Sequence, residues 1–273
     1  MQNSSKYPLV RTIQKNAHTI LDAEGAGNRL TLVLGLFVAT GMGLFIPILL
    51  DCLALLVPIL GGTAGVWFSV IYEVLFWGSL LFVTLPLCMA VYRMAVSMVS
   101  VHDTLCPDTL MPPKIRLYEC LYPFTSAKAY KRTLVAGLQV VLHLGGTVLL
   151  PWCFVRLTNI WLPTLKEMTN APVTLTLAQI GVAILLGLVW LLVGCKYHGY
   201  AYLVFAHPEM SLKDCIKRHR NCKNPGKEAL RLTWVSLGRG ILGALLVWIP
   251  LFLHTLPSLM LSWAVYDRDL FDR

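Results

Sequence analysis

Charged residues are scarce in this chain, and their scarcity excludes an ordinary soluble fold. Only 14% of the 273 residues are Asp, Glu, Lys or Arg, whereas 56% are apolar and the mean hydropathy is +0.66. A soluble domain carries more charge on its surface. Because a helical span takes about 20 apolar residues, the length allows roughly five or six spans with short loops and no extramembrane domain. The composition predicts an all-α, polytopic membrane helix bundle.

The sequence also lacks the short motifs that mark familiar membrane enzymes. It contains no HExxH zinc helix, no G-x-S-x-G turn and no Walker loop. Its eight cysteines include no CxxC pair and no regular spacing, which argues against a disulfide scaffold. No cofactor is expected, and an enzyme is the weaker class, with a membrane-embedded hydrolase kept as a third option.

Four apolar runs predict four spans, at residues 30–50, 66–92, 133–155 and 173–195. A fifth run, 234–266, is too long for one upright span and too short for two full ones. We favour a short C-terminal helical hairpin over a single exit helix there, which gives five to six transmembrane helices. Residues 1–29 are expected to form a cytoplasmic or interfacial segment with amphipathic character, and residues 30–273 one membrane-embedded helical domain.

The formal net charge is +9, and the basic residues are concentrated in segments that are expected on one side of the membrane. Of the 23 Lys and Arg residues, four lie in the N-terminal segment, six in 93–132 and eight in 196–233, which are the segments expected on one side of the membrane. The positive-inside rule places these segments, and the N-terminus, in the cytoplasm. We therefore expect a multi-pass protein of the cell membrane that attracts anionic lipids and does not bind nucleic acid.

Two stripes of small residues predict close packing between helices. At a spacing of four residues, small side chains let two helix backbones approach each other in lipid. The second stripe overlaps a GxGxxG string at 238–243, but no strand precedes it, so a dinucleotide site is not indicated. The stripes are Gly35, Ala39 and Gly43, and Ser236, Gly240 and Ala244.

Two charged residues interrupt the apolar runs and form a candidate intramembrane polar site. A charge at the centre of a span costs at least about 2.5–3.5 kcal/mol, so such a residue is expected to face the protein interior, a water-filled cavity or the interface. A structural ion pair, or an arginine that reaches back to the interface, is the alternative. The candidates are Glu73 and Arg239, with Asp51, His143 and His254 as neighbours.

A basic helix expected near 211–222 supports two interpretations. Cys215, His219 and Cys222 share one helical face, and thiolates with an imidazole suit zinc or copper(I). We favour the simpler interpretation, an amphipathic helix at the membrane surface that begins at Ser211 and needs no metal. Its basic residues are then lipid-headgroup contacts. They are Lys213, Lys217, Arg218 and Arg220.

The block from Ala201 to Arg220, with its His-Pro pair and basic helix, precedes a long apolar run that ends in the segment from Ala264 to Leu270. This pattern resembles the bacterial integral-membrane family catalogued as domain of unknown function 975. The stretches 11–27 and 117–132 resemble the family more loosely. The resemblance implies a membrane fold of roughly six helices in a bacterial protein, and it implies no established activity.

The function expected from these features is a non-catalytic accessory or scaffold in envelope or lipid-associated processes. The alternative is a transporter or permease component that moves an ion or a small amphiphile. The two differ in one respect, because a transporter needs a polar cavity that reaches the middle of the membrane. Expected partners are membrane lipids, anionic on the cytoplasmic side. A protein partner or assembly into a homo-oligomer is a further possibility.

Overall fold

A computed structural model describes residues 10–22, 27–55, 62–104, 115–168, 172–196, 199–222, 229–235, 253 and 255–272. Within these ranges the chain is helical and contains no strand, which confirms the all-α expectation. The elements in chain order are α1 (Val10–Leu21), α2 (Asn28–Ala54), α4 (Gly62–Ser79), the π-helical turn η1 (Leu80–Thr84), α5 (Leu85–Thr104), the 3-10 helix η2 (Leu117–Thr125), α6 (Ala127–Val140), the π-helical turn η3 (Val141–Gly145), α7 (Gly146–Met168), α8 (Pro172–Lys196), α9 (Tyr200–Ala206), α10 (Leu212–Asn221) and α13 (Leu256–Phe271).

Three described helical stretches are long and apolar enough to cross a membrane, namely Asn28–Ala54, Trp67–Ser100 and Val173–Leu192. They cover the first, second and fourth predicted spans. The third predicted span is helical in α6, η3 and α7 but does not belong to these three. Most of the predicted C-terminal hairpin lies outside the described residues, and its last part is α13. The membrane character is supported, whereas a total of five or six spans is not confirmed.

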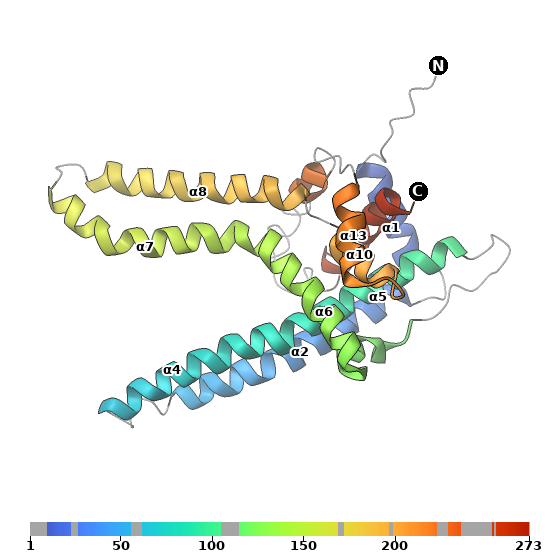
Figure 1. The fold of residues 1–273 in the computed structure, drawn as a ribbon, viewed down its shortest axis with the longest axis horizontal. Coiled ribbons are helices and arrows are strands. Elements are labelled where there is room, and N and C mark those ends of the chain that lie inside the picture. The colour runs from blue at the N-terminus through green and yellow to red at the C-terminus, as the bar shows by residue number, and fades with distance from the viewer. Residues whose placement is uncertain are drawn as a thin grey trace, which may run out of the picture.

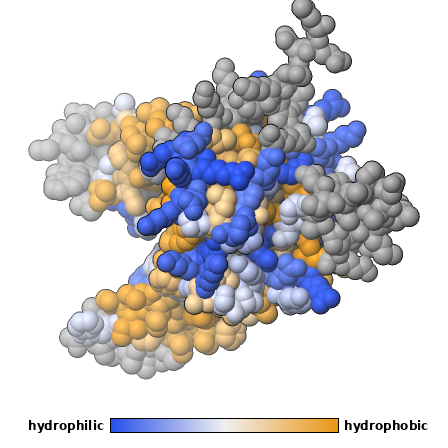
Figure 2. All heavy atoms as spheres, turned by 45° about the vertical axis from the view of Figure 1, so that its right-hand side comes forward, coloured by the Kyte–Doolittle hydropathy of each residue, from blue (hydrophilic) through white to orange (hydrophobic). Residues whose placement is uncertain are grey.

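Two helical arms project from a cluster of short helices (Figure 1). The first arm pairs α2 with α4, η1 and the beginning of α5, and the second arm pairs α7 with α8. The cluster, which we call the hub, contains α1, η2, α9, α10 and α13 with the adjoining ends of α5 and α6. In Figure 2 the arms are largely hydrophobic, whereas hydrophilic residues gather over the hub. The two ends of the described chain both lie at the hub.

Small residues of α2 lie against the long helix of the first arm. Ala39 is fully buried, and a Cβ added to Gly35 would meet the Met94 side chain at 3.4 Å. At Gly43 the approach is closer, because a Cβ would lie 2.8 Å from Cγ2 of Thr84. The Thr84 hydroxyl donates a hydrogen bond of 2.7 Å to the Gly43 carbonyl. This stripe therefore holds the arm together, while the second stripe, at 236–244, lies outside the described residues.

The π-helical turns η1 and η3 each have a carbonyl that accepts a hydrogen bond from an aromatic side chain of another helix. The Tyr130 hydroxyl donates to the Phe82 carbonyl in η1 at 2.8 Å. Trp190 Nε1 donates to the Leu142 carbonyl in η3 at 3.0 Å. A π turn breaks the regular helical ladder, and in an apolar environment its carbonyls need other donors. These two bonds connect successive helices at the points where each ladder is interrupted.

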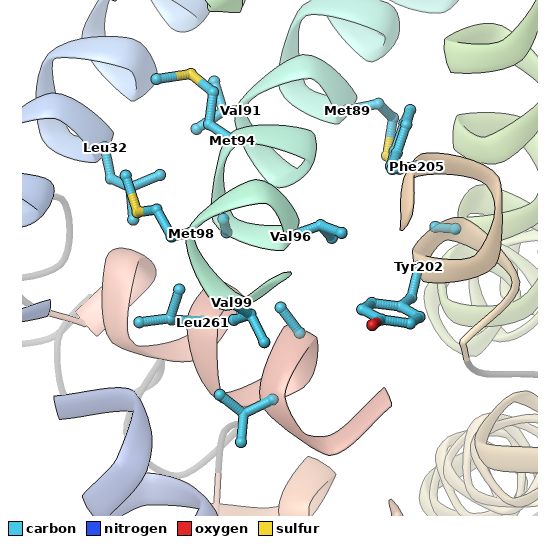
Figure 3. Close-up of a cluster of buried hydrophobic side chains, with 14 of the residues drawn as sticks. Leu32, Met89, Val91, Met94, Val96, Met98, Val99, Tyr202, Phe205 and Leu261 are labelled. Carbon is cyan, nitrogen blue, oxygen red and sulfur yellow. The ribbon is translucent and has the colours of Figure 1, made fainter. Parts of the chain in front are cut away.

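The core of the hub surrounds the second half of α5. Met94 and Val99 of α5 are fully buried in one cluster with Leu32 of α2 and Leu261 of α13 (Figure 3). From α9, every residue between Tyr200 and Phe205 is buried. Because α9 has no exposed face over these six positions, the hub packs around it on all sides.

The first helix belongs to the same core. Its buried residues recur on one helical face, and this face packs on α13. After a left-handed turn at Gly27, where φ is 61°, the Asn28 side-chain amide donates a hydrogen bond of 2.9 Å to the Ile20 carbonyl. Arg29 forms an ion pair of 2.6 Å with Asp22. These contacts fix α1 against the start of α2. The buried residues of α1 are Ile13, Ala17, Ile20 and Leu21.

Candidate functional site

The two candidate membrane acids lie in the first arm, toward the end that is remote from the hub. Asp51 lies three residues before the end of α2 and accepts a hydrogen bond of 2.5 Å from the Tyr72 hydroxyl. Oε2 of Glu73 accepts a hydrogen bond of 2.8 Å from Trp77 Nε1. Both acidic residues are exposed. Each carboxylate is thus bonded to an aromatic donor on the surface of the arm.

The other members of that candidate set are not brought together with these acids in the described part of the chain. Arg239 and His254 lie outside the described residues, and so do the second-stripe residues Ser236, Gly240 and Ala244. His143 belongs to η3, but the structure does not describe the placement of its side chain. A joint site of all five residues therefore stays a prediction.

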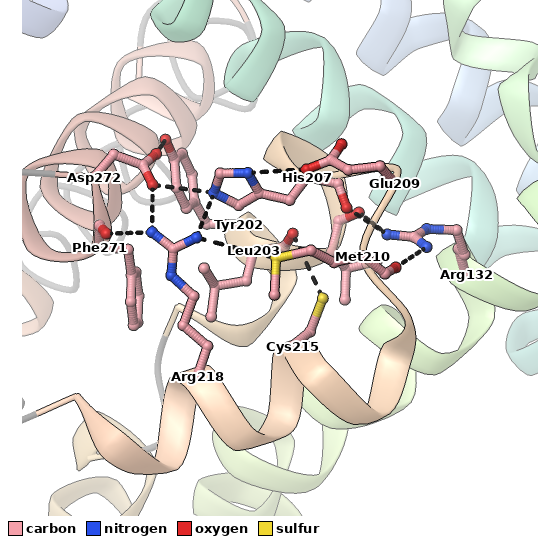
Figure 4. A network of polar contacts seen from close by, with 11 residues as sticks. Arg132, Tyr202, Leu203, His207, Glu209, Met210, Cys215, Arg218, Phe271 and Asp272 are labelled. Carbon is pink, nitrogen blue, oxygen red and sulfur yellow. Dashed lines mark hydrogen bonds and ion pairs between the residues drawn. The ribbon is translucent and has the colours of Figure 1, made fainter.

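A different polar cluster lies in the hub, around the carboxylate of Asp272 (Figure 4). The Tyr202 hydroxyl donates a hydrogen bond of 2.5 Å to Oδ2 of Asp272. Oδ1 accepts from Nη2 of Arg218 at 3.0 Å. The same Nη2 donates to the Phe271 carbonyl at 2.6 Å. These contacts attach the residues that follow α13 to α9 and α10.

His207 occupies the centre of this cluster and has two competing partners. Its Nε2 lies 3.0 Å from Oδ1 of Asp272 and 3.2 Å from Nη1 of Arg218, while Nδ1 lies 3.4 Å from Oε1 of Glu209. A protonated Nε2 donates to the carboxylate, whereas an unprotonated Nε2 accepts from the guanidinium. The partner that Nε2 binds therefore depends on whether this nitrogen carries a proton.

Arg132 connects α6 to the end of α9 from the other side. Arg132 is only 5% exposed. Its guanidinium donates hydrogen bonds to three backbone carbonyls, those of Val204 at 2.7 Å, His207 at 3.0 Å and Met210 at 2.8 Å. The last carbonyls of a helix have no partner within the helix and carry partial negative charge. Arg132 supplies both the donors and the opposite charge at this helix end.

Buried charge also lies on α13. Asp267 is fully buried and accepts a hydrogen bond of 3.1 Å from the Tyr92 hydroxyl of α5. The next residue, Arg268, pairs with Asp269 at 3.0 Å, and both side chains are less than a tenth exposed. Because buried charges are costly without partners, these contacts make the hub dependent on its polar groups as well as on its apolar core.

The thiols and phenols of the hub are held in their neutral forms. Burial raises the pKa of Cys215 and of Cys222, and it raises the pKa of Tyr200 to about 12. Burial, together with the hydrogen bond to Asp272, raises the pKa of Tyr202. A nucleophile is activated by the opposite shift. The cluster therefore has the chemistry of a structural network.

The residues considered for metal binding are engaged separately. Cys215 is fully buried, with its thiol 3.8 Å from the Leu203 carbonyl, and the thiol of Cys222 lies 3.8 Å from the Leu270 carbonyl. The His219 ring packs edge-on against Tyr200, with 6.4 Å between ring centroids. Within the described residues, no three His, Cys, Asp or Glu side chains are grouped so that they could hold a metal ion.

The basic residues of α10 divide into two groups. The helix begins at Ser211, whose hydroxyl accepts a hydrogen bond from the Asp214 amide at 3.2 Å, as the sequence predicts. Lys213, Lys217 and Arg220 are exposed and remain available as headgroup contacts. Arg218 instead points into the Asp272 cluster. Its role in joining α10 to the chain end was not foreseen.

Sequence reasoning found the segment of the hub cluster but not its pairing. Tyr202, His207 and Arg218 all belong to the block between Ala201 and Arg220, which carries the family resemblance. Their partners are 54 to 70 residues away, since Arg218 binds Asp272 and Tyr202 binds the same carboxylate. Arg132 gave no signal beyond its place in a basic loop.

No family model, no curated protein and no solved structure matches this chain. The resemblance to the bacterial family described above is therefore untested and stays a prediction.

Proposed function

We propose that the protein is a non-catalytic scaffold of the cell membrane. Its apolar arms anchor it and offer surface to lipid and to other membrane proteins, while its hub stands at the cytoplasmic side. The polar groups of the hub serve to lock short helices together. The observation that carries the proposal is the exposure of α8.

The helix α8 has little contact with the rest of the chain. Only 11% of the residues in its most apolar stretch are buried, against 39% in α2 and 33% in Trp67–Ser100. Its main packing partners among the described elements are α7 and η3, and the first arm stands apart from it (Figure 1). Side chains such as Leu177 and Ile184 are about 60% exposed. A helix that helped to enclose a transport path would be covered on more than one side, so this exposure favours a contact surface.

The position of the acids weighs against the transporter alternative. If α2 crosses the membrane from Arg29, then Asp51 lies about 33 Å farther along at about 1.5 Å per residue. The hydrocarbon core is about 30 Å thick, so Asp51, its partner Tyr72 and the adjacent Glu73 reach the opposite headgroup layer. Aromatic donors such as Trp77 are typical of that layer. A translocation site is expected near the midplane instead.

The packing of the hub supports an even number of spans. α13 packs against α1, so the last described helix lies beside the first. Two helices on one side of the membrane require an even number of crossings between them, which argues against a single exit helix. The exposed cations of α10 lie on the hub as well, and the positive-inside rule assigns that side to the cytoplasm.

The proposal is tested by asking what contacts α8 in the native membrane. A photoreactive benzoylphenylalanine at position 184, in place of Ile184, is activated in intact cells, and its adducts are identified by mass spectrometry. We expect adducts with lipid and with a second polypeptide chain. The matched control is the same probe in place of Leu75, which is half exposed on α4 in the other arm.

Adducts between position 184 and peptides of α2 or α4 in the same chain would contradict the proposal. They would mean that the arms close into one bundle around a path. Adducts from both probes with lipid alone would also count against a scaffold role, because a scaffold has a protein partner.

A further inference from the structure

A groove opens where the end of α8 meets the hub. Its volume is about 580 Å³, within the 300–1,000 Å³ range that is typical of small-molecule sites. One wall is formed by Leu188, Leu191 and Leu192 of α8, and the other by Leu230 and Trp234 from the helical residues 229–235. Val10, the first residue of α1, also lines the groove.

The lining of this groove is apolar except for one cation. Among the described residues that line the groove, Arg231 is the single charged one. Arg11, which follows Val10 in α1, is exposed. A long apolar cleft with positive charge at its margin matches an amphiphile that has an acyl chain and an anionic headgroup.

The groove is continuous with the surface that α8 offers to the membrane. Leu188 and Leu192 end the apolar stretch Val173–Leu192, and they are 45% and 51% exposed. An acyl chain can therefore enter from the hydrocarbon layer without crossing water. Trp234, 65% exposed at the groove, is a residue type that favours the headgroup depth. These positions place the groove at the border between hydrocarbon and headgroups.

We propose that this groove binds one acyl chain of an anionic phospholipid, with the phosphate held near Arg231. The inference rests on the membrane anchoring proposed above. It adds a defined lipid site to that role, at the junction of the second arm with the hub. A lipid bound there would contact α8, α1 and residues 229–235 at once, and so would brace the exposed arm against the hub.

The test measures lipid retention by the full chain in nanodiscs of palmitoyl-oleoyl phosphatidylcholine and phosphatidylglycerol. After release into the gas phase, native mass spectrometry counts the lipids that remain bound. We expect one phosphatidylglycerol to be retained preferentially by the unmodified protein. One basic residue near a membrane surface contributes about 1 kcal/mol, so Arg231→Gln should reduce this preference about fivefold. Lys128→Gln, at an exposed cation on α6 that does not line the groove, should leave it unchanged.

A second pair of variants tests the apolar part. Leu188→Trp fills the groove from an exposed position and should lower retention of both lipids, whereas Leu177→Trp, exposed on the same helix outside the groove, should not. Equal behaviour of the two members in either pair would overturn the proposal. Failure of the chain to enter nanodiscs would refute the anchoring itself, which separates the two hypotheses.

Discussion

At the scale of single residues, the hub is distinguished by polar side chains that bind backbone carbonyls as well as one another. Arg132 is the clearest case of the first kind, because one guanidinium binds three carbonyls at the end of α9 and in the turn that follows it. A buried polar group that loses its partner costs about 1–3 kcal/mol. The position of α9 within the core therefore depends on a residue that is 72 positions away in sequence from the first carbonyl that it binds.

We expect Arg132→Met to lower the free energy of unfolding by about 3–5 kcal/mol, because three carbonyls lose their donor while the side-chain volume is nearly kept. Denaturant unfolding in detergent micelles, followed by circular dichroism, measures the change. The neighbouring Lys131 is exposed, so Lys131→Met should change stability by less than about 0.5 kcal/mol. Similar losses for the two variants would show that Arg132 does not cap α9.

At the scale of helices, apolar run length predicted where the long helices lie. The runs at 30–50, 66–92, 133–155 and 173–195 all fall within helices of the structure. The π-helical turns η1 and η3 were not predicted, because the sequence pattern of a helix does not show where one extra residue is inserted. The carbonyls of these turns bind Tyr130 and Trp190, which lie 48 residues away in sequence. The burial of α13 in the hub was also not predicted, because its apolar residues fit a membrane span as well as they fit a buried core helix.

Two glycines of α2 provide a matched test of the first arm. A Cβ at Gly43 would lie 2.8 Å from Thr84, whereas a Cβ at Gly41 meets nothing within 4 Å. We expect Gly43→Ala to destabilise the protein by about 1–3 kcal/mol through overpacking, and Gly41→Ala to be neutral or slightly stabilising. Thermal unfolding in micelles compares them. If Gly43→Ala is as stable as Gly41→Ala, the close approach of α2 to η1 is wrong.

At the scale of the whole molecule, the sequence predicted membrane character and sidedness but not the division into arms and hub. That division depends on contacts between distant segments, such as the bond between Tyr92 and Asp267 across 175 residues. Local patterns carry no information about which segments pair over such separations.

The two arms stand apart in the structure, and a distance measured in nanodiscs tests whether they do so in a membrane. Spin-labelled amino acids at positions 45 and 184, in place of the exposed Phe45 and Ile184, report the distance between the arms by pulsed electron paramagnetic resonance. A reference pair at Trp152 and Ile184 reports the packed helices α7 and α8, whose axes are expected to lie about 8–10 Å apart. We expect the distance between positions 45 and 184 to be clearly longer than the reference distance. A distance equal to the reference would mean that α8 packs against α2, and would contradict this expectation.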